Sequence, residues 1–423
     1  MQRLLSLLAL GFAAAAPAAA QDFAVTNGRV ITNTGSGVIE NGTVLMRDGV
    51  IVAVGADVDV PEGAETVDAD GGWITPGIFA PLTQLGLVEV ALEDSANDSA
   101  AADTGFSAAI DVTDAFNPNG SYIATNRIEG ITRFAIFPST GEEIFGGRGA
   151  LADATGDYDS VFQPRAFMFA DLSQSGAATA GGSREAAWLF LEAAFGDARA
   201  YPGRYSGGSE GDVISRMDAA ALVDVTRGRI PLVVNVDRAS DILRAIRFSQ
   251  DHAPVRVIIQ GGAEAWMVAS QLADANIPVL LDPLRNLPSS FDSLGSTLAA
   301  AQRLNGAGVT VAYTTESADG YFNARLLPQH AGNAVAHGVP WDDAFRAITS
   351  TPAEIYGVGD RYGALAPGYA ADVVVWDGDP LEVMSAPTHV FIDGEETEME
   401  SRQTRLAQRY RDLEDTTPFA YRR

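Results

Sequence analysis

The chain has 423 residues, 47% of them hydrophobic, which suffices for one large barrel with a smaller domain or for two or three ordinary domains. Its 55 acidic residues outnumber its 28 basic residues, all of them arginine, and the formal net charge of −27 argues against nucleic acid and anionic membrane surfaces as partners. The absence of cysteine excludes disulfides and thiolate metal sites.

The first twenty residues have the layout of a secretory signal peptide. They begin with a basic residue, Arg3, continue with a short apolar core and end in a small-residue A-x-A motif before Gln21. Because the apolar core is short, we expect cleavage there rather than retention as a membrane anchor. The mature protein is then expected to begin near Gln21, to be secreted or periplasmic, and to have no membrane span.

Two segments far apart in the sequence read as short antiparallel strands. Residues 22–73 alternate apolar and polar positions around the turn signals "TNG", "ENG" and "RDG". Residues 363–398 return to this pattern in "ADVVVWDGDP" and "THVFIDGEE". We expect the two segments to form one composite β domain. Residues 399–423 are expected to form an arginine-rich tail with a surface helix.

Residues 74–362 alternate apolar strand runs with amphipathic helices. The clearest strands are "ITRFAIF", "RAFMFA", "PLVVNV", "VRVIIQ", "IPVLLD" and "VTVAYTT". Continuous apolar strands between such helices are typical of parallel strands covered by helices, and their number predicts an α/β fold, a (β/α)₈ TIM-like barrel. The acidic insertion at residues 86–120 is expected to form a long loop at the barrel mouth, either functional or a mobile flap without a specific role.

The run "AFRAITSTPAEIYGVGDRYGALAPGYAADVVVWDGDPLE" strongly resembles the closing segment of the amidohydrolase superfamily, in its imidazolonepropionase-like branch. The runs "GITRFAIFPSTGEEIFGGRGAL" and "ITPG" resemble the second-strand region and the approach to the first barrel strand. The resemblance covers nearly the whole mature chain. It implies hydrolysis of non-peptide C–N bonds in small cyclic amides, with zinc or another divalent metal held by histidines and a carboxylate at the barrel mouth.

The positions at which this family places its metal ligands hold other residues here. They are Leu82 and Gln84 on the first strand, Asn235 on the fifth, Gln260 on the sixth, and Glu316 within one residue of the catalytic aspartate of the eighth. A carboxylated lysine is impossible in a chain without lysine. Since amides are weak ligands for zinc-type ions and leucine is no ligand, we expect no cofactor and no bound transition metal.

Asp237 and Glu316 are the candidate catalytic residues. They can act together as an acid/base pair or hold a hard cation such as Ca²⁺. The alternative is that both carboxylates are solvated or paired with Arg238 or Arg325.

The four histidines do not replace the missing ligands. His252 follows a helix, and His389 belongs to the β domain. His330 and His337 are seven residues apart on the helix after the eighth strand, and therefore on one face. His330 is the candidate substrate contact, and the alternative is that both residues pack or lie on the helix surface.

Three functions remain open at this point. The chain is a metal-free amidohydrolase-like protein that binds a small ligand or supports an active paralogue in a hetero-oligomer. Alternatively, it is a working hydrolase with a site rebuilt from Asp237 and Glu316. The third reading is a non-catalytic interaction protein, including self-association as a homo-oligomer.

Overall fold

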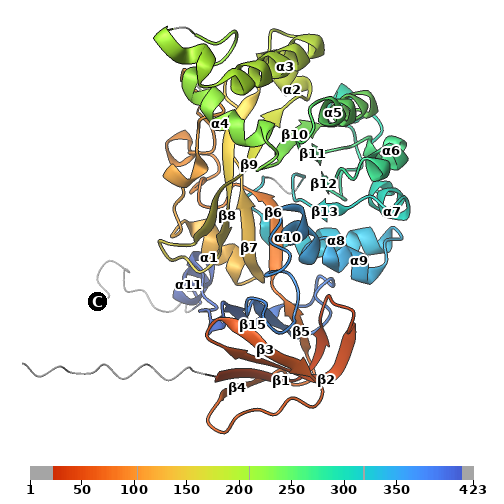
Figure 1. Cartoon of the computed structure of the whole chain (residues 1–423). Helices are drawn as coiled ribbons and strands as arrows, with labels where there is room; N and C mark the ends of the chain where they lie inside the picture. Colours follow the sequence, from red (N-terminus) through yellow and green to blue (C-terminus); the bar gives the residue numbers. More distant parts are fainter. Residues whose placement is uncertain (1–21, 102, 209, 318–319, 412–423) are drawn as a thin grey trace, which may run out of the picture.

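The computed structural model describes residues 22–101, 103–208, 210–317 and 320–411, so the expected signal segment and residues 412–423 lie outside the described residues. Two sheets of eight strands each form the framework (Figure 1). Over the described ranges, no helix combines the length and the apolar character needed to cross a bilayer.

The smaller sheet contains β1 (Asp22–Ile31), β2 (Val38–Arg47), β3 (Val50–Gly55), β4 (Glu65–Asp68), β5 (Trp73–Pro76), β14 (Val373–Trp376), β15 (Pro387–Ile392) and β16 (Glu395–Glu396). The larger sheet contains β6 (Ile78–Thr83), β7 (Ile131–Ile136), β8 (Phe145–Asp153), β9 (Val161–Asp171), β10 (Leu232–Val236), β11 (Val257–Gly261), β12 (Val279–Leu281) and β13 (Val311–Tyr313).

The α-helices are α1 (Ser121–Arg127), α2 (Gln174–Thr179), α3 (Arg184–Ala200), α4 (Arg216–Thr226), α5 (Ala239–Asp251), α6 (Ala269–Asp274), α7 (Ala300–Gly306), α8 (Leu327–Ala336), α9 (Trp341–Arg346), α10 (Ser350–Ile355) and α11 (Arg402–Arg409). The 3₁₀ helices are η1 (Asp94–Ala96), η2 (Val112–Asp114), η3 (Gly203–Gly208), η4 (Ala265–Val268), η5 (Phe291–Ser293) and η6 (Ala324–Leu326).

The smaller sheet joins the two ends of the chain. Its strand order is β16-β15-β14-β5-β1-β2-β3, with β4 beside β1. The antiparallel pair β14–β5 makes the junction and places Trp376 opposite Trp73. Alternating apolar residues of both ends then share one core, in which the rings of Phe23 and Phe391 lie 4.9 Å apart between centroids. This sheet lies at the bottom of the molecule in Figure 1.

The larger sheet confirms the predicted TIM-like barrel, with one difference. Its order runs from β6 to β13 in sequence, but β8 is antiparallel to both β7 and β9. The links at residues 137–144 and 154–160 are too short for the crossover that parallel neighbours require. Residues 347 and 348 bridge the gap between the first and last strands, since their carbonyls accept hydrogen bonds from Tyr313 N at 3.0 Å and Phe79 N at 2.9 Å.

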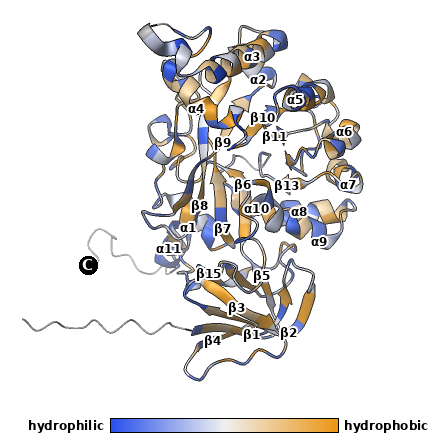
Figure 2. Ribbon diagram, viewed as in Figure 1, coloured by the Kyte–Doolittle hydropathy of each residue, from blue (hydrophilic) through white to orange (hydrophobic). Residues whose placement is uncertain are grey.

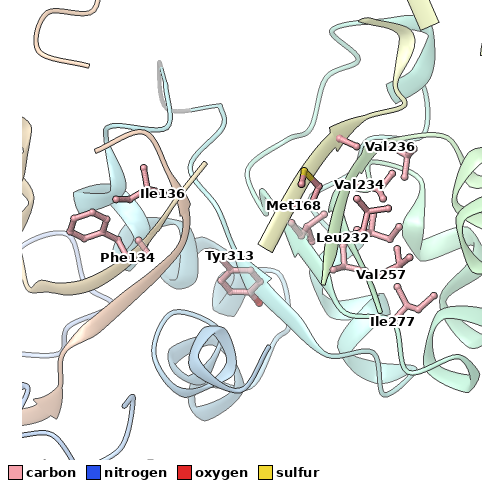
Figure 3. Packing of buried hydrophobic residues seen from close by; sticks show 14 of the residues in the cluster. Phe134, Ile136, Met168, Leu232, Val234, Val236, Val257, Ile277 and Tyr313 are labelled. Atoms are coloured by element: carbon pink, nitrogen blue, oxygen red, sulfur yellow. The ribbon is translucent and has the colours of Figure 1, made fainter. Parts of the chain in front are cut away.

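Side chains along the barrel strands alternate between two cores. On β10, Leu232, Val234 and Val236 belong to the outer core beneath the helices, where Figure 3 shows them near Met168. Val233 belongs to the inner core of the barrel. Figure 2 shows that hydrophobic residues gather along barrel strands such as β6, whereas hydrophilic residues lie on outlying helices such as α5 and α11.

The acidic insertion at residues 86–120 is anchored by hydrogen bonds. The backbone N–H groups of Ser107 and Ala109 donate to the Asp218 carboxylate of α4 at 2.9 and 2.8 Å. Ser139 N donates to the Ser99 carbonyl at 2.7 Å. The insertion therefore packs against the barrel as a structured segment with two 3₁₀ turns, not as a free flap.

A buried arginine connects the barrel to the β domain. Arg133 of β7 is 2% exposed, and its guanidinium binds Asp372 and Asp393, each at 2.7 Å. The same group lies 4.6 Å from the ring centroid of Tyr362. Since Asp372 precedes β14 and Asp393 follows β15, these contacts fix the β domain against the amino-terminal end of the barrel, opposite the mouth.

Candidate functional site

Polar residues lie at the carboxyl-terminal ends of the barrel strands, on the face that points into the barrel. Along β10 the inner-core residue Val233 is followed two positions later by Asn235, and along β11 Ile258 is followed by Gln260. The period of two in a strand puts both members of each pair on the same face. Three further strands, β9, β12 and β13, also have a polar residue two positions after an inner-core residue. These polar residues are Asp171, Asp282 and Thr314. The barrel interior is thus apolar in its depth and polar at its carboxyl-terminal mouth.

A cavity of about 380 Å³ opens at this mouth. Its walls are the segments that follow β9, β10, β12 and β13, and the lining residues are Ser173, Gln174, Ser175, Ala178, Asn235, Asp237, Arg285, Ser289, Ser290, Asp292 and Glu316. This is the face at which TIM-barrel enzymes carry their active sites. Among the residues singled out from the sequence, Asn235, Asp237 and Glu316 line the cavity together.

Arg285 joins the two candidate catalytic carboxylates. One of its terminal nitrogens lies 2.9 Å from Asp237 Oδ1 and 3.7 Å from Glu316 Oε2. The Ala263 N–H also donates to Asp237 Oδ1, at 3.1 Å. The partner of these carboxylates is therefore neither Arg238 nor Arg325, the two candidates near them in sequence. Arg285 comes from the loop after β12, 48 residues from Asp237.

Burial has the largest effect on the pKa of both carboxyl groups. It raises the pKa of Asp237, which is 6% exposed, and the opposing effects of Arg285 and the Ala263 N–H do not cancel it. Burial also raises the pKa of Glu316, with Arg285 opposing and the charge of Asp237 adding to the increase. Two carboxyl groups with raised pKa values thus face one cavity and share one guanidinium.

Gln260 lies beside the cavity in a polar cluster with Tyr321. Its Nε2 donates to the Tyr321 hydroxyl at 2.7 Å and to Glu316 Oε2 at 3.4 Å. Its carbonyl oxygen Oε1 is buried and accepts no hydrogen bond from the residues that the structure describes. Burial and the neighbouring Glu316 charge raise the pKa of Tyr321 well above its ordinary value, so its hydroxyl stays protonated at neutral pH.

The side chains of the two first-strand positions make no hydrogen bond within this cluster in the part of the chain that the structure describes. Leu82 is 2% exposed and packs in the inner core with aromatic residues such as Phe137. Gln84 donates from its side chain to the Ser139 hydroxyl at 2.6 Å. Neither residue lines the mouth cavity.

His330 does not line the cavity either. It is 2% exposed, and its Nδ1 lies 3.1 Å from the Thr314 carbonyl and 3.3 Å from Asp282 Oδ1. Burial has the largest single effect on Asp282 and disfavours its ionised form, but the interactions with His330 and Ser317 together outweigh burial and lower its pKa. His330 therefore contacts the segments that follow β12 and β13. His337, at the end of α8, is exposed and faces the Asn333 carbonyl.

A second carboxylate network supports the other wall of the cavity. Asn235 Nδ2 donates to Asp171 Oδ1 at 3.2 Å, and the Gln174 N–H donates to Asp292 Oδ2 at 2.8 Å. Asp292 also pairs with Arg184 of α3. Asp171, Arg285 and Asp292 were not singled out from the sequence. Asp171 carries the same signal as Asn235, an inward strand position at the mouth, whereas the two loop residues carry no local signal.

Over residues 22–411, apart from the undescribed positions 102, 209, 318 and 319, no group of three or more histidine, cysteine, aspartate or glutamate side chains is placed to hold one metal ion.

Comparisons with known proteins agree on the family. A family model described as "Amidohydrolase family" matches residues 249–398. The solved structure of an amidohydrolase from Thermotoga maritima MSB8 superposes with a TM-score of 0.80 at 25% identity, covering 88% of this chain and 99% of that one. The chain belongs to the amidohydrolase superfamily. The whole barrel and the composite β domain are thus the architecture of this superfamily, as the sequence resemblance implied.

Matches to curated amidohydrolases are short. Amidohydrolase tasK of Hapsidospora irregularis is 37% identical over 98 residues, which is 23% of this chain and 10% of tasK. The imidazolonepropionase of Mesorhizobium japonicum is 46% identical over 55 residues, 12% of this chain and 13% of that enzyme. The chain thus spans about a tenth of the length of the curated relatives it matches, and these local matches agree with the imidazolonepropionase-like branch.

Proposed function

We propose that this amidohydrolase-superfamily chain binds a small polar ligand in its barrel mouth without a catalytic transition metal. It then acts as a ligand-binding protein or as an auxiliary subunit of an active paralogue. The observation that carries the proposal is the position of Arg285, whose guanidinium lies between Asp237 and Glu316. Its positive charge lies 3.7 Å from Glu316, near the position where the resemblance implies the metal-binding carboxylate of the family, and this supports a site without a metal.

The donor groups at the mouth do not fit the family's metal. Gln260 is engaged with Tyr321, Leu82 offers no donor atom, and Asp237 Oδ1 already accepts two hydrogen bonds. A divalent ion beside these groups would also be repelled by Arg285. At about 4 Å and an effective dielectric constant of about 20, this repulsion is about 4 kcal/mol for each unit of charge on the ion. Neutral imidazoles, which normally offset the dehydration of the ion, are missing from the cavity lining.

The same groups suit a ligand with both donors and acceptors. The cavity of about 380 Å³ has the size of a small-molecule pocket. Asp237 and Glu316 line it with carboxylate oxygens that can accept from a ligand N–H group. A ligand carbonyl can accept from Arg285 or Asn235, which line it too. A small cyclic amide, the substrate class of the family, presents both kinds of group.

Elemental analysis and ligand binding test the proposal on the purified mature chain. We expect well under one Zn, Mn, Fe or Co per chain and no change in thermal stability with EDTA. A stoichiometric metal that is lost in Gln260→Ala or Glu316→Ala would overturn the proposal.

For binding, calorimetric titration with a cyclic amide such as hydantoin should show saturation. Asn235→Ala should weaken it, whereas the matched control Asn333→Ala, an exposed asparagine on α8, should not. Equal binding by both variants would move the ligand away from the mouth.

A rebuilt hydrolase is the second candidate, favoured by the raised pKa values of Asp237 and Glu316. In this scheme the ionised carboxylate takes a proton from the attacking water, and the protonated carboxyl group donates one to the leaving nitrogen. Hydrolysis of a cyclic amide by metal-free protein would support it. Asp237→Asn and Glu316→Gln should then each lower kcat by about 10²–10⁴-fold. Unchanged rates in both variants would exclude this pair from the mechanism.

The proposal includes export, with a mature chain that starts near Gln21. N-terminal sequencing of protein from its native host tests this, and an intact Met1 would contradict it.

A further inference from the structure

A second cavity, of about 600 Å³, lies beside the barrel mouth between α3 and α5. Its lining residues are Gly182, Ser183, Arg184, Glu185, Trp188, Arg238, Ser240, Asp241, Arg244 and Arg247. The two helices lie near each other beyond the ends of β9 and β10 in Figure 1. We call this cavity the arginine groove. It is distinct from the mouth cavity, and Asp237 and Arg238 are consecutive residues that line one each.

The charge of the groove is opposite to that of the chain. Four arginines and two acidic residues line it, in a protein with a formal net charge of −27 and no lysine. Arg184 is neutralised by Asp241 and Asp292, and Arg244 by Glu192 at 2.8 Å. Within the described part of the chain, Arg238 and Arg247 have no carboxylate within ion-pair distance of 4 Å. The guanidinium groups of Arg238 and Arg247 are therefore not engaged in ion pairs with described residues, and their N–H donors remain available to an anion.

The surroundings hold this positive charge in place. The guanidinium of Arg244 lies 5.2 Å from the ring centroid of Trp188, which is 8% exposed. Arg238 is the N-cap residue of α5, and the Ala239 N–H that follows it donates to the Glu264 carboxylate at 3.0 Å, which fixes this end of the helix. Arg244 and Arg247 are three residues apart on α5 and thus lie on neighbouring positions of one helix face.

We propose that the arginine groove binds an oxyanionic group, a carboxylate or a phosphate, of a small ligand. Planar guanidinium groups recognise both by paired N–H···O hydrogen bonds, which are stronger than neutral ones. Arg238 and Arg247 supply the free charges, and Arg244 and Ser240 contribute further donors to the wall. Arg184 links the groove to the mouth, because it pairs with Asp241 on the groove side and with Asp292 on the mouth side. This site stands apart from the proposed cyclic-amide ligand and does not depend on it.

Titration of the mature chain with sodium phosphate and with sodium succinate tests the site. Ionic strength is held constant with sodium chloride, because any salt screens the self-repulsion of so acidic a chain. We expect saturable binding by calorimetry and a saturable rise of Tm for at least one probe. A preference for phosphate or for succinate then distinguishes the two sources of the oxyanion.

The variant Arg238→Gln/Arg247→Gln should bind on the order of tenfold or more weakly. The substitutions break no ion pair among the described residues, and an unchanged circular dichroism spectrum verifies that the variant is folded. The single variant Arg247→Gln, at an exposed position, provides a second and milder test. Arg216→Gln, which removes an exposed arginine from α4, should leave binding unchanged. No saturable response to either probe, or equal affinity in the double variant and the wild type, would overturn the inference.

Discussion

Replacing Arg285 by methionine removes the single cation that Asp237 and Glu316 share. Methionine keeps much of the length of the side chain, so the substitution acts mainly on charge. Asp237 is 6% exposed and would retain one hydrogen bond, from the Ala263 N–H. Its carboxylate would then be a buried charge without a counter-ion.

The expected loss follows from this burial. Breaking a buried ion pair by removing one partner costs about 3–5 kcal/mol in the free energy of unfolding. Glu316 contributes less, about 1 kcal/mol at most, because its side chain is 31% exposed and lies 3.7 Å from the guanidinium. We therefore expect Arg285→Met to destabilise the protein by about 3–5 kcal/mol at about pH 8.

The loss should depend on pH in one direction. The pKa of Asp237 is raised in the folded protein, so its ionised form destabilises the fold at pH values above that pKa. Arg285→Met raises this pKa further. As the pH falls toward the unfolded-state pKa of about 3.9, Asp237 takes up a proton and the loss should shrink.

Urea unfolding at about pH 8 and about pH 5 measures this difference. The double variant Asp237→Asn/Arg285→Met has no buried charge at this position and should return to within about 1–2 kcal/mol of wild type. Arg216→Met, an exposed control, should change the unfolding free energy by no more than about 0.5 kcal/mol. A loss that is independent of pH, or one that Asp237→Asn does not restore, would refute the reasoning.

Three further predictions concern the frame of the site. Arg133→Met should cost about 3–5 kcal/mol of unfolding free energy in urea denaturation, because it leaves the carboxylates between barrel and β domain unpaired; a cost below about 1 kcal/mol would contradict this role. Gly261→Ala should lower the free energy of unfolding by about 1–3 kcal/mol, because its φ is +87° and a Cβ would lie 2.8 Å from Asp237 Oδ1. The control Gly308→Ala measures the backbone contribution alone, because Gly308 has a φ of +80° but no atom within 4 Å of an added Cβ. Equal costs would show that the close approach is harmless. Asp282→Asn should lower the thermal stability of the protein at neutral pH. Because the pKa of Asp282 is lowered in the folded protein, the difference in Tm from wild type should disappear as the pH falls through that pKa. A difference in Tm that stays constant with pH would show that the charge of Asp282 is not the cause.

The sequence alone determined those features that depend on local periodicity. Continuous apolar runs along 232–236 and 257–261 identified barrel strands, and the family resemblance singled out Asn235 and Gln260 within them. Side-chain alternation in a strand puts these two residues on the same face as Val233 and Ile258. The expectation that histidine is missing from the family's ligand positions also came from the sequence resemblance alone. The same alternation, extended from Phe169 to Asp171 and from Leu280 to Asp282, would have identified two more polar residues of the mouth.

Only the tertiary structure decided which side chains meet. Arg285 reaches Asp237 across 48 residues from a loop, and nothing in a loop sequence fixes where a long, flexible side chain will end. The orientation of β8 depended on the lengths of two links, and the burial of His330 depended on the packing of α8 against the segments after β12 and β13. Periodicity states which face a residue takes within its own element. Which charges neutralise one another is set by distances between elements, and those exist only once the barrel has closed.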